Sequence, residues 1–316
     1  MNPEVSVVIP TYNRAAMVRE AALSVLAQRG VDYELIVIDD GSTDGTAGDL
    51  ARLREESGGQ VRIERIENSG VAAARNRGVA LARAPLVAFL DSDDLWMPDK
   101  LARQLDFMRA HPECEVSQCQ ERWIRGGRRV NPGYRHRKRG GDLFFDSLRT
   151  CLISPSAVIM RIDLFRALGG FDETMRACED YDLWLRILVT REIGLLDEVL
   201  LERRAGHPDQ LSAAVAALDR YRILGLVKLL TDSRLSDSRR DTVTQVLAEK
   251  CAIYANGLRR RDRADAALYI ERVGAQALGD WRGAPGESIA IAAAELRNLV
   301  NLNVQSESPP ARALEK

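Results

Sequence analysis

A chain of 316 residues with a formal net charge of −1 at pH 7 has room for one large domain and a smaller one, and its overall charge does not indicate nucleic-acid binding. Its five cysteines are scattered without a Cys-x-x-Cys pair, which favours reduced thiols over a disulfide framework or a zinc site. Because the N-terminus lacks the pattern of a signal peptide and no uncharged stretch approaches the roughly 20 apolar residues of a membrane span, we expect a cytoplasmic protein.

The first ninety residues alternate between strand and helix patterns. Short apolar runs predict strands at 5–9, 33–38, 61–66 and 86–90. Helical spacing of apolar residues predicts helices at 14–29, 46–56 and 70–84. This alternation, with short connections, predicts an α/β fold in which helices sandwich a mostly parallel sheet.

The strand at 86–90 leads directly into a group of acids. Its five apolar residues are typical of a strand buried on both faces, and Asp91, Asp93 and Asp94 follow at once. Ligands bind at the carboxyl ends of strands in open α/β sheets. Three carboxylates this close together indicate a hard divalent cation, Mg²⁺ or Mn²⁺. On these residues alone, a polar turn that caps the next helix is an equal alternative.

The remaining elements divide the chain in two. Patterns of both kinds continue to about residue 211, with a helix at 97–110, a strand at 115–123, a strand region at 151–160 and helices at 162–168 and 181–189. From residue 212 strand patterns vanish, and helices are predicted at 213–230, 237–257, 263–279 and 287–302. We therefore predict a catalytic domain at 1–211, an all-α C-terminal extension at 212–305 and a disordered tail at 306–316.

The segment 122–139 has the strongest local charge bias. It carries eight Lys or Arg residues and no acid, with Gly and Pro interspersed. One interpretation is an exposed flexible loop. The other is a mobile lid that contacts an acceptor or phosphate, and an acceptor linked to a lipid diphosphate or a membrane surface would suit its charge. The sequence leaves both interpretations open.

Several other α/β folds are disfavoured. A dinucleotide-binding domain needs G-x-G-x-x-G after its first strand, where this chain has Pro10-Thr-Tyr-Asn13 instead. The phosphate-binding sequence G-x-x-x-x-G-K-[ST] is absent. A receiver domain would also gather acids at strand ends, but it would leave the second half of the chain unexplained.

Six motifs in order carry a resemblance to a known family. They are Val5–Asn13, Glu34–Asp44, Asn68–Gly78, Phe89–Asp94, Gly169–Asp172 and Glu179–Trp184. Together they resemble the family 2 inverting glycosyltransferases with the GT-A fold, over about residues 4–211 or two-thirds of the chain. Each motif is weak by itself, and their order and spacing make the resemblance specific.

The resemblance implies a binding site for a nucleoside diphosphate sugar, most simply a UDP-sugar. Asp91-Ser92-Asp93 matches the family's D-x-D motif, so Asp93 is expected to ligate Mn²⁺ or Mg²⁺, with Asp91 and Ser92 beside the metal or the ribose. Asp40 matches the acid that accepts a hydrogen bond from the nucleobase. Since side chains alternate along a strand, Asp39 and Asp40 are not expected to face the base together, and a structural role for Asp39 is equally open.

Other residues receive roles from the same resemblance. Those expected to line the base, ribose or phosphate site are Pro10, Thr11, Tyr12, Arg75 and Asn76. For Arg75 the alternative is a solvated helix face. His207 is a candidate metal ligand, with Arg203 or Arg204 as diphosphate contacts.

The resemblance also implies a general base. Glu179-Asp180 matches the family's E-D motif, in which Asp180 takes the proton of the attacking hydroxyl, and repulsion between these two acids would raise one pKa. The alternative for Asp180 is an N-cap of the following helix. Ser154 and Trp184 are expected on the acceptor side, with the protein core as the alternative for Trp184.

We therefore predict a metal-dependent inverting glycosyltransferase of bacterial cell-surface polysaccharide assembly, acting on a glycan or lipid-linked acceptor. Peripheral association with the inner face of the cytoplasmic membrane is compatible with this prediction. The alternatives are a sugar-nucleotide nucleotidyltransferase and a protein that binds nucleotide sugars, or serves as a scaffold, without turnover. The helical extension is expected to act as a lid, a dimer contact or a surface for an acceptor partner.

Overall fold

The computed structural model describes residues 2–131, 133, 137–206, 217–279, 281 and 287–302. Contacts between Cα atoms divide the chain into two compact units, Met1–His207 and Pro208–Lys316.

One sheet runs through the first unit. Its strands are β1 Val5–Thr11, β2 Tyr33–Asp39, β3 Val61–Arg65, β4 Leu86–Phe89, β5 Leu95–Trp96, β6 Val116–Arg125, β7 Arg128–Val130, β8 Val158–Arg161 and β9 Gly194–Ala205. Among the described residues they form a nine-stranded sheet in the order β3-β2-β1-β4-β8-β6-β9-β5, with β7 paired to β6. The four strands β3, β2, β1 and β4 are mutually parallel, and β6 and β9 are parallel to each other. β8 and β5 pair antiparallel with their neighbours.

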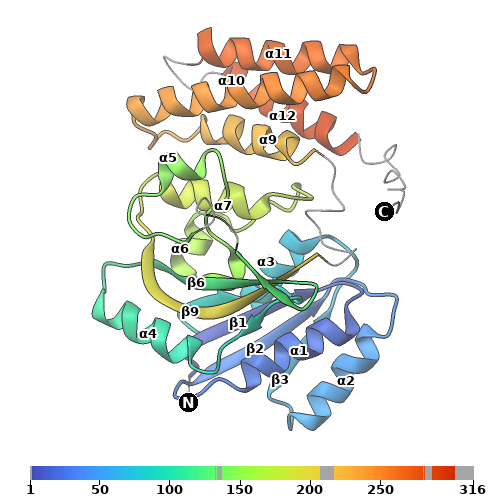
Figure 1. Ribbon diagram of the computed structural model, residues 1–316, viewed down its shortest axis with the longest axis vertical. Helices are drawn as coiled ribbons and strands as arrows, with labels where there is room; N and C mark the ends of the chain where they lie inside the picture. The colour runs from blue at the N-terminus through green and yellow to red at the C-terminus, as the bar shows by residue number, and fades with distance from the viewer. Residues whose placement is uncertain are drawn as a thin grey trace. The chain divides into compact units, whose positions relative to one another are not determined.

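Helices cover both faces of this sheet (Figure 1). They are α1 Ala15–Leu26, α2 Thr46–Glu56, α3 Val71–Leu81, α4 Lys100–Ala110, α5 Phe144–Ser147, α6 Ile162–Ala167 and α7 Glu179–Leu188. Alternation along the strands decides which helix each side chain meets. Val7 of β1 belongs to the same core cluster as Val18 of α1 and Leu53 of α2. Ile36 of β2 packs with Ala74 of α3 in a separate cluster.

The predicted fold class is confirmed, with corrections to individual elements. Pro10 and Thr11, expected in a loop, are the last residues of β1. β4 pairs with β1 only as far as Phe89, opposite Val8, so Pro10 lies beyond the end of that ladder and its missing N–H leaves no ladder bond unmade. Strands β5, β7 and β9 were not predicted.

The basic segment 122–139 is in part a β-hairpin. Arg122–Arg125 continues β6, and β7 folds back on it across Gly126 and Gly127 to form a hairpin. Lys138, at the other end of the segment, is buried. The expectation of a loop is therefore wrong for Arg122–Arg125 and Arg128–Val130, although Arg125 and Arg128 are exposed, and residues 132 and 134–136 lie outside the described part of the chain.

The second unit is helical where it is described. Its helices are α9 Asp219–Leu229, α10 Asp237–Arg259, α11 Ala264–Gly279 and α12 Glu287–Leu302. They confirm the four helices expected after residue 212. The predicted tail at 306–316 lies outside the described residues. None of the described helices is long and apolar enough to cross a membrane.

Candidate active site

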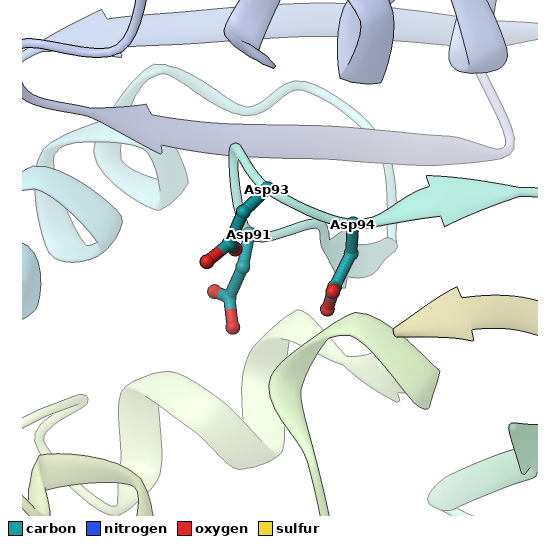
Figure 2. A group of neighbouring side chains, drawn as sticks. All are labelled: Asp91, Asp93 and Asp94. Carbon is teal, nitrogen blue, oxygen red and sulfur yellow. The ribbon is translucent and has the colours of Figure 1, made fainter. Parts of the chain in front are cut away.

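The three acids after β4 lie together. Asp91, Asp93 and Asp94 each offer a carboxylate oxygen, and these oxygens are within 4.8 Å of one another. Figure 2 shows the three side chains pointing to the same side of their loop. The loop leads into β5 rather than into a helix, so the alternative of a turn that caps the next helix is wrong. Clustered carboxylate oxygens of this kind are the ligands that Mg²⁺ and Mn²⁺ prefer.

Asp94 anchors this loop to two neighbouring segments. Its Oδ2 accepts a hydrogen bond of 2.6 Å from Ser156 Oγ, and its Oδ1 accepts one of 3.0 Å from the backbone N–H of Arg204. Ser156 Oγ in turn accepts from the N–H of Asp91 at 3.1 Å. Burial raises the pKa of Asp94 well above its ordinary value, and the charges of Asp93 and Asp91 add to the rise. Asp94 thus fixes the loop, while Asp91 and Asp93 remain partly exposed.

Arg14 neutralises part of this negative charge. Its guanidinium lies 2.9 Å from Asp93 Oδ2, and its backbone N–H donates to Thr46 Oγ1 at 3.0 Å. Sequence reasoning missed this contact, although Arg14 directly follows the Pro-Thr-Tyr-Asn motif. The sequence did offer a signal for it, because Arg14 follows the first strand and the predicted acids lie at the same carboxyl ends of the strands.

Arg75 connects the loop that carries Asp91, Asp93 and Asp94, here called the acid loop, to the second acidic motif, Glu179-Asp180. One guanidinium nitrogen lies 2.6 Å from Asp91 Oδ1 and another lies 2.6 Å from Glu179 Oε1. The side chain is buried, so the alternative of a solvated helix face is wrong. Burial by itself would lower the pKa of Arg75, but the carboxylates of Asp91 and Glu179 outweigh it and raise that pKa. Arg75 therefore stays charged and ties two segments far apart in sequence.

Glu179 and Asp180 begin α7. The residue before the helix is Cys178, so the alternative of Asp180 as the N-cap is wrong. Burial raises the pKa of Glu179 to about 7, with Arg75 opposing the rise and Asp180 adding to it. Asp180 is partly exposed; its Oδ1 accepts from the N–H of Tyr181 at 2.7 Å, and its Oδ2 accepts from Cys151 Sγ at 3.6 Å. Of the two acids, Asp180 is the one open to a substrate.

The acids that end β2 have different partners. Asp39 is buried, and its Oδ1 accepts from the N–H of Ser42 at 2.9 Å, which fits the structural role left open for it. The two oxygens of Asp40 accept from the N–H groups of Ser69 and Gly70 at 2.8 and 2.9 Å. Burial raises the pKa of Asp40, although these two hydrogen bonds oppose the rise. Asp40 thus positions the N-terminus of α3.

Asn76 shapes a turn. Its Oδ1 accepts from the N–H of Phe171 at 3.0 Å, and its Nδ2 donates to the carbonyl of Phe171 at 2.9 Å and to Glu173 at 2.8 Å. These three bonds fix Asn76 against Phe171 and Glu173, in and next to the Gly-Gly-Phe-Asp segment. Asn76 therefore positions this turn, and its contact with the nucleotide stays a prediction.

Two residues expected on the acceptor side are buried. Trp184 is 1% exposed and packs edge-to-face on Phe171, so it belongs to the core rather than to an acceptor wall. Ser154 Oγ donates to Glu121 at 2.7 Å and accepts from Lys138 Nζ at 2.9 Å. Glu121 and Lys138 were not singled out from the sequence, because nothing local marks two residues that meet only through folding.

Three further candidates from the sequence are Tyr12, Ser92 and His207. Tyr12 is 45% exposed at the end of β1, where stacking on a ligand is possible. Ser92 is buried, and its Oγ lies 3.5 Å from the Arg14 guanidinium. His207 lies outside the described residues.

Comparison with known proteins identifies the family of this chain. The model of the family described as "Glycosyl transferase family 2" matches residues 6–169. The chain belongs to glycosyl transferase family 2. The members of this family are glycosyltransferases of the inverting class. Membership does not support the nucleotidyltransferase alternative.

Three family relatives illustrate the similarity. An uncharacterized glycosyltransferase of Rickettsia typhi is 30% identical over 241 residues, which are 74% of each chain. Another from Rickettsia felis is 32% identical over 78% of this chain, and the chain spans only 40% of that protein's length. The putative teichuronic acid biosynthesis glycosyltransferase TuaG of Bacillus subtilis is 44% identical over 34% of this chain and 42% of its own.

Solved structures share the GT-A fold. TarS of S. aureus, crystallised with UDP-GlcNAc, superposes with a TM-score of 0.70 at 20% identity, over 96% of this chain and 92% of that one. The mannosyltransferase PcManGT of Pyrobaculum calidifontis, in complex with GDP-Man and Mn²⁺, gives a TM-score of 0.56 at 18% identity, over 96% and 85% of the two chains. The likeness at these identities concerns the fold.

Proposed function

We propose that this family 2 glycosyltransferase is metal-dependent and moves a sugar, with inversion, from a nucleoside diphosphate sugar to a glycan or lipid-linked acceptor. One observation carries the proposal. Arg75 joins the acid loop at Asp91 to Glu179, the neighbour of Asp180, so the two acidic motifs form one site. The buried Arg75 thus holds the proposed diphosphate site at Asp91 a fixed distance from the candidate base, Asp180.

The acid loop fits a divalent cation. Its donors are hard carboxylate oxygens close to one another, and Asp94 is already occupied by Ser156 and the Arg204 amide. Asp91 and Asp93 are therefore the residues that would hold Mn²⁺ or Mg²⁺, and His207 remains a proposed further ligand. A bound cation would supply Lewis-acid stabilisation of the departing diphosphate. Arg14, beside Asp93, would add positive charge at the same place.

The donor is proposed to be a UDP-sugar. Two structures with a similar fold were solved with UDP-GlcNAc and with GDP-Man, which supports a nucleoside diphosphate sugar as the ligand class. Asp40, at the end of β2, keeps lone pairs beyond those that bind the Ser69 and Gly70 amides and is proposed to accept from the base. Tyr12, exposed at the end of β1, is proposed to stack on the base, with Pro10 and Thr11 behind it.

Asp180 is proposed as the general base. Its carboxylate takes the proton of the acceptor hydroxyl while the hydroxyl oxygen attacks the anomeric carbon of the donor. The bond from that carbon to the diphosphate oxygen breaks, and the nucleoside diphosphate leaves with the electron pair. Glu179 keeps Arg75 in place beneath this centre.

The biological setting is proposed to be assembly of cell-surface polysaccharide. The name of TuaG supports this setting, since that relative is assigned to teichuronic acid biosynthesis. We retain the expectations of a cytoplasmic location and of peripheral association with the membrane as parts of the proposal.

Thermal unfolding with nucleotides and metals tests the donor site. UDP, GDP, CDP, TDP and ADP are each added with Mn²⁺, with Mg²⁺ or with EDTA. A ligand at about a hundred times its dissociation constant stabilises the folded state by roughly 2.7 kcal/mol, so binding is measurable. We expect a shift with UDP that needs metal and that Asp93→Asn abolishes. Asp32→Asn, an exposed acid outside the site, is the matched control. No shift with any nucleotide would favour the scaffold alternative.

A further inference from the structure

One face of the β6–β7 hairpin carries positive charge that the reaction described above does not use. β6 ends at Arg125, β7 begins at Arg128, and the two-residue turn between them is Gly126-Gly127. Both glycines have positive φ, +55° and +74°, which a tight hairpin turn of this length requires. The turn therefore fixes Arg125 and Arg128 beside each other.

The strand register determines which side chains share this face. Trp123 pairs with Val130 of β7 and with Arg203 of β9, and Arg125 pairs with Arg128. Paired residues point to the same side of a sheet, as do residues two apart along a strand. Consistently, the Arg203 guanidinium lies over the Trp123 ring, 5.1 Å from its centroid. We call Trp123, Arg125, Arg128 and Arg203 the arginine face.

The arginine face begins at the active site. Glu121 lies on the same side of β6, two residues before Trp123, and it accepts a hydrogen bond of 2.7 Å from Trp123 Nε1. Arg203 lies 3.5 Å from the same carboxylate. The next residue of β9 donates its backbone N–H to Asp94 in the acid loop. The face therefore leads from the acid loop outward to the hairpin turn.

The charges at the outer end of this face lack a counterpart in the described part of the chain. Arg125 and Arg128 are exposed and directly opposite each other, and like charges in that position repel. No carboxylate of the described residues lies within ion-pair distance of either one. Arg122, on the opposite face, does have such a partner, because it pairs with Glu202 at 2.8 Å. An anion bound across Arg125 and Arg128 would relieve their repulsion.

We propose that the arginine face binds an acceptor glycan that carries carboxylate or phosphate groups. Arg125 and Arg128 bind its acidic groups, for which the planar guanidinium fork is well suited. The Trp123 ring offers an apolar surface to a sugar ring. This inference rests on the proposed function, and it adds the chemical class of the acceptor.

The observations favour a glycan over an anionic membrane. The face is continuous with the acid loop, as an acceptor path has to be. A hairpin that inserts into a membrane surface would present large apolar side chains at its tip, and none of the exposed large apolar residues of the described chain lies on this hairpin.

Direct binding tests the inference with the full chain. The probes are a galacturonic acid oligosaccharide, the methyl ester of the same oligosaccharide, which is uncharged, and a glycerol phosphate oligomer. We expect the wild-type protein to bind the acidic probes and not the ester, with an affinity that falls as salt increases. Arg125→Glu and Arg128→Glu should each weaken this binding about tenfold or more, as expected when an attractive charge becomes repulsive.

Two controls make the outcome specific. Arg54→Glu makes the same charge change at an exposed position of α2 and should leave binding unchanged. Metal-dependent UDP binding is measured on every variant; we expect Arg125→Glu and Arg128→Glu to keep it, so that failure of the donor site is distinguished from failure of the arginine face.

Three results would overturn the inference. The first is equal binding of the ester and the acid. The second is unchanged affinity of the two hairpin variants for the acidic probes. The third is the absence of binding to either acidic probe, with binding instead to phosphatidylglycerol vesicles that the hairpin variants lose, which would assign the face to a membrane.

Discussion

Arg75 shows how much of the site depends on contacts between distant residues. Asp91 is 16 positions away from it in sequence and Glu179 is 104 positions away, yet one guanidinium bonds both. The acidic motifs themselves were predictable, because each is a short local pattern at the end of a strand or the start of a helix. The ion pair that joins them was not, since no local pattern specifies which buried cation two acids will share.

Glu121 also owes its role to residues distant in sequence, which no local pattern predicts. Its burial leads to a prediction about the pH dependence of stability. Its side chain is 3% exposed and lies 3.3 Å from Lys138 Nζ. Burial would raise the pKa of Glu121, but Lys138, Arg203 and the Ser154 hydroxyl outweigh it and lower that pKa to about 2. The unfolded chain therefore binds a proton more readily than the folded protein. The stability that Glu121 contributes is complete above about pH 4.5 and is lost as the pH falls toward 2.

Glu121→Gln should remove this dependence. We expect the variant to be less stable at pH 7 by about 3 kcal/mol, because Lys138 loses its buried partner. Its free energy of unfolding should then fall less steeply than that of the wild type as the pH decreases from about 4.5. Urea unfolding at a series of pH values measures both effects. Glu56→Gln, which breaks an exposed pair with Arg19, is the control and should leave the slope unchanged. Parallel curves for Glu121→Gln and the wild type would contradict the assignment.

At the scale of elements, the sequence predicted the strands that precede the site better than those that complete it. β4 is apolar throughout, and β1 and β2 are mostly apolar, as expected for strands covered on both faces. β9 reads Gly-Leu-Leu-Asp-Glu-Val-Leu-Leu-Glu-Arg-Arg-Ala and alternates poorly. Its pairing with β6 shifts register near Gln120, so neither strand keeps one simple period.

Close packing of α3 on β1 gives a prediction at this scale. A Cβ at Gly78 of α3 would lie 2.2 Å from Cγ1 of Val8, so the helix can approach the strand only without a side chain there. Gly78→Ala should destabilise the protein by about 1–3 kcal/mol, despite the better helix propensity of Ala. Gly48 of α2 has no neighbour within 4 Å of such a Cβ, so Gly48→Ala should stabilise by up to about 1 kcal/mol. Chemical unfolding compares the two, and changes of the same sign would contradict the packing argument.

For the whole molecule, the division into two units leads to a prediction about unfolding. Each unit has buried apolar residues of its own, among them Val7 in the first and Leu247 in the second. We expect calorimetry to resolve two transitions, of which UDP with metal raises only one, because the proposed donor site lies within the first unit. A single transition would show that the units unfold as one, and two transitions that both shift would show that their unfolding is coupled; either result would contradict the prediction.

The central claim is that the two acidic motifs form one transferase centre with Asp180 as its base. The most direct test compares the wild type with Asp180→Asn, measuring UDP binding and UDP release from a panel of UDP-sugars on the same samples. Removing a positioned base lowers the rate by about a hundredfold or more. We predict that Asp180→Asn releases UDP at least about a hundredfold more slowly than the wild type and keeps its metal-dependent UDP binding unchanged. Release at the wild-type rate by Asp180→Asn would contradict the account.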